Sequence, residues 1–171
     1  FGRDAVLDAL AEAPAVPGRF EPLRFAEGPT VIVDYAHTPD ALDNILRAVR
    51  ATMPDGATLW CVFGCGGDRD PGKRPTMGRI AEQLADRAIV TSDNPRTEAP
   101  VAILRDIRDG VERPESMRWI VDREEAIQAA ADETMPGDVV VIAGKGHETT
   151  QTIGTDTRPF DDCEMARRYF G

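Results

Sequence analysis

The sequence predicts an α/β domain in which a mostly parallel sheet carries helices on both faces. Short apolar runs rich in Val and Ile recur along the chain, each bounded by turn residues. Most of these runs lack polar alternation, as expected of strands that are covered on both faces. Amphipathic stretches of about 10 to 14 residues separate them, which is the spacing of helical crossovers between parallel strands. Together these observations favour one continuously wound sheet.

The first residues are predicted to form a short helix over 3–13 that ends before a Pro-Gly turn. So brief a helix ahead of a turn is typical of the end of another unit. We therefore interpret residues 1–15 as the tail of a preceding domain and residues 16–171 as the domain itself.

Strands are expected at residues 20–25, 30–35, 59–63, 88–91, 117–121 and 138–143. The first two are predicted to pair across a Glu-Gly-Pro turn. Thr38 fits an N-cap and Pro39 a first helical position, so a helix is expected to start there. Asp122 begins a capping-box pattern for a later helix. A hairpin over 149–158 and a final helix from Asp161 complete what we predict to be a Rossmann-like domain.

Composition excludes several classes of partner. The chain has 171 residues, of which 42% are hydrophobic and 29% charged, as in a soluble globular domain. Its net charge of −10 opposes binding to phosphate backbones or anionic membranes, so nucleic acid is excluded as the main partner. No apolar run approaches the roughly 20 residues of a membrane span, and no secretory signal pattern is present, so a cytoplasmic protein is expected.

The three cysteines form no C-x-x-C pair, and the chain has only two histidines. A structural metal site or a disulfide framework is therefore not expected. Cys61 lies inside an apolar run and is predicted to be a small core residue.

Residues 92–100 form the most informative loop, Ser-Asp-Asn-Pro-Arg-Thr-Glu-Ala-Pro. It follows an apolar run, and an open α/β sheet places its ligands outside the carboxyl ends of strands. Its carboxylates, carboxamide and guanidinium could hold a small ligand that carries both signs of charge. Taken alone, an ordinary polar loop is the simpler interpretation.

Residues 67–74 match G-x-x-x-x-G-K between a strand and a helix, but we reject a phosphate-binding P-loop. Arg74 stands where Ser or Thr must bind magnesium, Pro75 removes a backbone amide, and two acids inside the loop would repel phosphate. We interpret the segment as a glycine loop that presents Arg69, and either Lys73 or Arg74, to an acidic ligand. A glycine-rich turn without a ligand remains the alternative.

Two further segments are candidates. His37 precedes a helix amino terminus, which favours anions such as a terminal phosphate, although a structural histidine is an equal alternative. Residues 144–148, Gly-Lys-Gly-His-Glu, combine close backbone approach with an ammonium and a carboxylate.

The loops at 64–75, 92–99 and 144–148 should emerge at one edge of the sheet. Their polar groups can then converge, with arginine forks for a carboxylate, acids for an ammonium and Asn94 as a neutral partner. The forks would be Arg69 and Arg96, and the acids Asp93 and Glu148. The residues thus predict a pocket for an amino acid with more than one carboxylate.

The runs at 34–40, 60–70, 93–96 and 144–148 together resemble the C-terminal domain of the Mur ligases, over nearly the whole chain from Val16 to Phe170. The resemblance implies an ATP-dependent amide ligase of peptidoglycan synthesis. The intact Asp-Asn-Pro-Arg run resembles the branch that adds meso-diaminopimelate to UDP-N-acetylmuramoyl-L-alanyl-D-glutamate. In that chemistry ATP phosphorylates the terminal carboxylate, and the incoming amine attacks the acyl phosphate.

By resemblance, the meso-diaminopimelate-binding residues are Arg69, Asp93, Asn94, Pro95, Arg96, Gly144 and Glu148. The residues on the ATP side are Asp34, His37 and Asp40. The family's phosphate loop, modified lysine and magnesium ligands belong to a central ATPase domain, of which residues 1–15 would be the tail. ATP and Mg²⁺ would be bound mainly by that central domain. The UDP-linked dipeptide would bind through missing domains. The full enzyme is expected to be a monomer. We therefore expect no catalytic residue or metal ligand here and no turnover by this stretch alone.

Two alternatives remain open. The chain could be a free-standing binding module that captures an acidic amino acid without chemistry. It could also be the equivalent domain of another Mur- or folylpolyglutamate-type ligase, although the Asp-Asn-Pro-Arg run argues against that.

Overall fold

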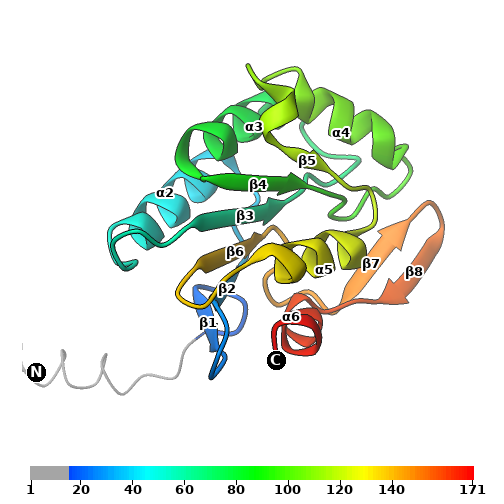
Figure 1. Cartoon of the computed structure of the whole chain (residues 1–171). Helices are drawn as coiled ribbons and strands as arrows, with labels where there is room; N and C mark the ends of the chain where they lie inside the picture. The colour runs from blue at the N-terminus through cyan, green and yellow to red at the C-terminus, as the bar shows by residue number, and fades with distance from the viewer. Residues whose placement is uncertain (1–15) are drawn as a thin grey trace, which may run out of the picture.

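A computed structural model describes residues 16–171, so the predicted helix at 3–13 and the domain boundary at 15 lie outside the described residues. Six strands form the main sheet in the order β1-β2-β6-β3-β4-β5 (Figure 1). They are β1 Glu21–Arg24, β2 Thr30–Asp34, β3 Leu59–Phe63, β4 Arg87–Val90, β5 Arg118–Trp119 and β6 Val139–Ala143. All neighbours pair in parallel except β1, which is antiparallel to β2 at one edge. The predicted fold class is confirmed.

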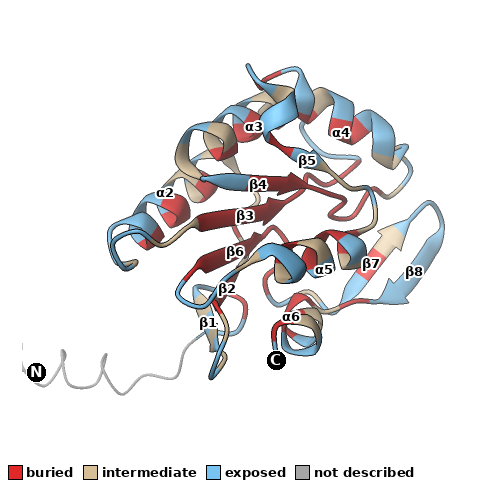
Figure 2. Cartoon of the chain, in the orientation of Figure 1, coloured by how far each residue is buried: buried red, intermediate tan, exposed pale blue. Residues whose placement is uncertain are grey.

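Helices cover both faces of this sheet (Figure 1). One face carries α2 Pro39–Arg50, α3 Lys73–Leu84 and α4 Pro100–Arg108, and the other carries α5 Arg123–Glu133 and α6 Asp162–Phe170. A separate hairpin consists of β7 Thr150–Ile153 and β8 Asp156–Pro159. Every residue of β3 and β6 is buried between the two helical layers (Figure 2), which explains their unbroken apolar sequences.

The helix starts follow the predicted caps. Thr38 accepts a hydrogen bond from the backbone of Ala41, with Pro39 in the first helical position. Asp122 caps α5 and Asp161 caps α6, each through its carboxylate. The strand expected at 117–121 is shorter in the structure, where β5 is an edge strand of two residues that pair with Ile89 and Val90 of β4.

The predicted core cysteine is confirmed, since Cys61 is fully buried in β3. Burial raises the pKa of all three thiols, of Cys61, Cys65 and Cys163, to about 12. Among residues 16–171, no helix has the length and apolar character that crossing a membrane requires.

One ion pair inside the domain was not predicted from the sequence. Arg123 and Asp162 are both fully buried and join α5 to α6 through two hydrogen bonds of 2.8 and 2.7 Å. Arg123 also donates to the carbonyl of Ser92 at 3.3 Å and to that of Ala143 at 3.0 Å. It therefore links the α5–α6 layer to the carboxyl ends of β4 and β6.

Asp162→Ala should lower the free energy of unfolding by about 3 to 5 kcal/mol, because it leaves the buried Arg123 charge without its counter-ion. The double change Arg123→Met with Asp162→Leu should recover only part of this loss, since the two backbone carbonyls lose their donor. Urea unfolding measures both effects.

Arg168→Met is the matched control, because Arg168 and Glu124 join the same two helices by an exposed pair at 2.9 Å. Its loss should stay below about 1 kcal/mol. Equal losses for the buried and the exposed pair would contradict the assignment of Arg123 as the link between the layers.

Candidate ligand site at the carboxyl edge of the sheet

A cavity of about 360 Å³ opens at the edge where the parallel strands end. The loops after β2, β3, β4 and β6 all contribute to it, so the structure brings the three predicted loops together. Its lining residues are Tyr35, His37, Thr38, Gly66, Arg69, Asp70, Lys73, Asp93, Asn94, Arg96, Gly144 and Glu148. The convergence follows from the topology, because parallel strands deliver their following loops to one edge.

Seven of the ten predicted site residues line this cavity, and three do not: Asp34, Asp40 and Pro95. Asp34 instead accepts hydrogen bonds from the backbone of Ala36 and of Phe20, each at 2.7 Å. Asp40 is exposed in the first turn of α2. Pro95 is buried.

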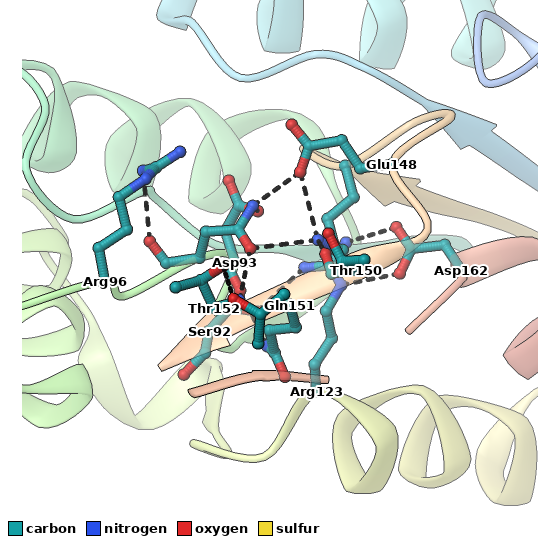
Figure 3. A network of polar contacts seen from close by, with 12 residues as sticks. Ser92, Asp93, Arg96, Arg123, Glu148, Thr150, Gln151, Thr152 and Asp162 are labelled. Carbon is teal, nitrogen blue, oxygen red and sulfur yellow. Dashed lines mark hydrogen bonds and ion pairs between the residues drawn. The ribbon is translucent and has the colours of Figure 1, made fainter. Parts of the chain in front are cut away.

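A network of polar contacts joins residues that line the cavity to the β7–β8 hairpin (Figure 3). Asn94 donates through Nδ2 to Glu148 Oε2 at 2.7 Å, and Lys145 Nζ lies 3.3 Å from the same oxygen. Asn94 Oδ1 accepts from the backbone of Thr152 at 3.0 Å. Lys145 is fully buried and also donates to the carbonyl of Thr150. Its ammonium is therefore internal, which differs from the expectation that residues 144–148 present it to a ligand.

Asp93 forms the floor of the cavity and is 7% exposed. Burial raises the pKa of its carboxyl group, while the charges of Arg123 and Lys145 act in the opposite direction. Gly144 passes directly over it with φ +119, and a Cβ at Gly144 would lie 3.7 Å from the Asp93 carboxyl carbon. The positive φ is what requires glycine here, because a Cβ at that distance would make only an ordinary van der Waals contact with Asp93.

The two predicted arginines lie on the same side of the cavity. A Cβ at Gly66 would be 3.0 Å from Arg96 Nη1 and 3.7 Å from Arg69 Cγ, so both side chains flank this glycine. Arg96 Nη1 donates to the carbonyl of Gly67 at 2.7 Å, and Arg69 Nη1 to that of Asp68 at 3.1 Å. Each guanidinium is pinned to the backbone through one nitrogen, and the arrangement suits capture of a carboxylate.

Sequence reasoning left open which of two basic residues would accompany Arg69. Lys73 lines the cavity and donates to the carbonyl of His37 at 2.7 Å. Arg74 is 1% exposed and ion-paired to Glu98 and Asp106, so the hypothesis that it faces a ligand is wrong.

Tyr35, Thr38, Gly66 and Asp70 line the cavity but were absent from the predicted set. The first two stand beside His37 in the same Asp-Tyr-Ala-His-Thr-Pro run, and the other two lie in the predicted loop at 64–75. The Tyr35 ring packs against His37, with ring centroids 4.7 Å apart. Membership of the predicted loops was therefore the signal that could have found them.

The β7–β8 hairpin supports the loop at 92–99 (Figure 3). The loop was predicted from the sequence, but this support was not. The fully buried Gln151 donates to the carbonyl of Asp93 at 2.8 Å. Arg96 donates through its backbone to Thr152 at 3.0 Å and accepts from Gly154 at 2.6 Å. The loop is thus held in place by a hairpin far along the chain.

The arrangement combines arginine forks with carboxylates across a small cavity, so it can bind a ligand carrying both carboxylate and ammonium groups. Within the described residues, no group of three or more His, Cys, Asp or Glu side chains is placed to hold a metal ion.

A family model described as "Mur ligase, glutamate ligase domain" matches residues 18–146. A UDP-N-acetylmuramoyl-L-alanyl-D-glutamate--2,6-diaminopimelate ligase of Thermosynechococcus vestitus is 54% identical over 96% of this chain and 33% of the relative. The ligase of the same name from Geobacillus kaustophilus is 51% identical over 98% of the chain and 34% of the relative. The chain therefore spans about a third of the length of these relatives.

Solved structures of ligases have a similar fold. A structure titled with the same diaminopimelate ligase name is 44% identical, with a TM-score of 0.83 over 99% of this chain and 34% of that one. Escherichia coli FolC with ADP has a TM-score of 0.64 at 23% identity, covering 85% of this chain and 32% of FolC, which shows the fold alone.

Asp93 and Asp68 should give the stability of the domain opposite dependences on pH. Asp93 has a raised pKa when folded, so its contribution is present below its unfolded pKa, about 3.9, and is lost as the pH rises through the folded value. Asn at position 93 does not titrate, so Asp93→Asn lacks this loss of stability. The unfolding free energy of the variant minus that of the wild type should therefore increase as the pH rises above about 4.

Asp68→Asn is the control of opposite sign. Hydrogen bonds from the Thr97 hydroxyl and then its amide lower the pKa of Asp68, so its contribution is present above the unfolded pKa and lost as the pH falls through the folded value. The stability lost in this variant should therefore shrink in acid. Urea titrations at a series of pH values check both slopes, and parallel profiles for the two variants would contradict the electrostatics of the site.

Proposed function

This chain belongs to the Mur ligase family, and on that premise we propose that it is the acceptor-binding domain of an ATP-dependent ligase that adds meso-diaminopimelate to UDP-N-acetylmuramoyl-L-alanyl-D-glutamate. The observation that carries the proposal is that Arg69 and Arg96, from two different loops, line the same cavity as Glu148 and Asp93. The names of relatives that match nearly the whole chain support it.

The charges of the cavity suit a diamino dicarboxylic acid. Arg69 and Arg96 would grip the carboxylate that such an acceptor carries and lysine lacks. Glu148 receives both of its internal hydrogen bonds on Oε2, and its side chain is 33% exposed, so Oε1 is suited to an ammonium group. The other amino group of the acceptor then remains for the reaction.

In the proposed reaction the acceptor amine attacks the carbonyl carbon of an acyl phosphate. The carbon–nitrogen bond forms, the carbon–oxygen bond to phosphate breaks, and the amine loses a proton. This domain contributes by orienting the amine, since fixed placement of a reactant lowers the entropic part of the barrier.

ATP would supply the phosphoryl group that activates the dipeptide carboxylate, with Mg²⁺ to balance its charge. The residues of this chain suited to its phosphates are His37 and Lys73, which line the cavity beside the amino terminus of α2. Asp34 would act by shaping the turn before His37, since it accepts a hydrogen bond from the amide of Ala36. Asp40 lies in the first turn of α2. Dependence on ATP and a nucleotide-linked substrate implies a cytoplasmic enzyme.

Calorimetry on the complete ligase should show tighter binding of meso-diaminopimelate than of L-lysine. A carboxylate bound by charged hydrogen bonds is worth about 1.5 to 3 kcal/mol for each bond, so the difference in Kd should be about 10-fold or more. Equal affinity for the two amino acids would overturn the proposed acceptor.

Arg96→Lys should weaken binding of meso-diaminopimelate about 10-fold, since lysine cannot present a planar fork, and should leave lysine binding nearly unchanged. Arg79→Lys, on the exposed side of α3, is the matched control and should alter neither affinity. An unchanged Kd for meso-diaminopimelate in Arg96→Lys would remove Arg96 from the site.

A further inference from the structure

The loop between β3 and α3, residues 64–72, and the loop at 92–99 lie backbone against backbone. The amide of Gly67 donates to the carbonyl of Asn94 at 2.8 Å. A Cβ at Gly67 would stand 1.8 Å from the carbonyl oxygen of Pro95, so no larger residue fits without moving one of the loops. The two loops that carry the arginines therefore behave as one unit.

Asp68 joins these loops at their exposed ends. Its carboxylate accepts from the Thr97 hydroxyl at 2.6 Å and from the Thr97 amide at 3.2 Å. Its own amide donates to Glu98 Oε1 at 2.6 Å. The hydrogen bonds from Thr97 lower the pKa of Asp68, because they stabilise its ionised form.

Arg74 joins the same loops from their buried side. Its two terminal nitrogens each lie 2.8 Å from one oxygen of Glu98, and it also donates to the carbonyl of Gly66 at 3.2 Å and to Asp106 at 2.7 Å. Arg74 is 1% exposed, so this bidentate pair is largely protected from solvent on the arginine side. Glu98 thus connects the exposed Asp68 to the buried Arg74.

We propose that Asp68, Arg74, Thr97 and Glu98, here called the loop clasp, are positioning residues for acceptor recognition. Asp68 directly precedes Arg69, and Thr97 directly follows Arg96, so the clasp fixes the backbone next to each ligand-facing arginine. Two forks that grip one carboxylate depend on their mutual distance, and a displacement of about 1 Å can cost up to about 100-fold in rate.

The inference rests on the proposed function and explains residues that the function alone does not use. The acidic residue that argues against phosphate in the glycine loop, Asp68, is a partner for the neighbouring loop instead. The arginine that replaces the P-loop Ser or Thr, Arg74, is the buried base of the clasp. Neither residue is required to touch the acceptor.

Steady-state kinetics of the complete ligase test the clasp through Asp68→Asn and Thr97→Val. Asn tolerates the positive φ of position 68, but it is uncharged and has one accepting oxygen where Asp68 has two, so it cannot accept from both the Thr97 hydroxyl and the Thr97 amide as the carboxylate does. Each variant should raise the KM for meso-diaminopimelate about 10-fold. The KM values for ATP and the UDP-linked dipeptide should change less than about 2-fold, because Asp68 and Thr97 are the direct neighbours of Arg69 and Arg96 and not of His37 or Lys73.

Thr97→Ser keeps the hydroxyl and should restore the wild-type KM. The double variant Asp68→Asn with Thr97→Val should be no worse than the poorer single variant, since both remove one interaction. Glu82→Gln is the matched control, because Glu82 also accepts two backbone amides, those of Glu112 and Arg113, but at a place away from the cavity.

Wild-type KM for meso-diaminopimelate in both Asp68→Asn and Thr97→Val would overturn the clasp, and so would an equal rise for all three substrates. Glu98→Gln, whose thermal unfolding reports whether the domain stays folded, should show the same selective rise. A wild-type ligase that does not prefer meso-diaminopimelate to lysine would overturn the proposed function, whereas a selective wild type with unaffected variants would overturn the clasp alone.

Discussion

A buried guanidinium, that of Arg123, connects the sheet, the helices and the candidate site. It pairs with Asp162 between α5 and α6 and donates to carbonyls at the ends of β4 and β6. Removing such a charge from water is costly and is offset only when the pairing and the remaining hydrogen bonds are complete, as they largely are here. The same charge, together with that of Lys145, opposes the effect of burial on the pKa of Asp93, so one side chain both joins two strand ends and acts on the carboxyl group beside them.

Above that floor, the polar groups divide into those that build the cavity and those that remain for a ligand. Lys145 and the Asn94 side chain both donate hydrogen bonds to Glu148, and Asn94 also accepts one from Thr152 of the β7–β8 hairpin. This fixes the orientation of the Glu148 carboxylate before any ligand arrives, which reduces the reorganisation that binding requires. The basic groups that line the cavity are the arginines and Lys73, and together with the Asp93 and Glu148 carboxylates the arginines suit an amphoteric acceptor.

Local features were predictable from the sequence, while contacts distant along the chain were not. Apolar runs and the Thr38 cap depend on neighbouring residues, so the strands, the helix starts and the shared loop edge could be predicted. Burial of Arg74 depends on Glu98, 24 residues away, and support from Gln151 depends on a contact 58 residues back to Asp93. Nothing in the local pattern distinguishes these side chains from exposed ones, which is why Arg74 was counted among the ligand candidates.

The backbone at Asp68 and Arg96 shows how this support becomes geometry. Both residues have positive φ, +54 and +52, which Asp tolerates well and Arg does not. Such a conformation costs about 1 to 3 kcal/mol and persists only where the surroundings determine it. At Arg96 the hairpin does so, because Thr152 and Gly154 hold the amide and the carbonyl of that one residue. The backbone from which its guanidinium extends is therefore fixed by β7 and the turn after it as well as by the loop that contains Arg96.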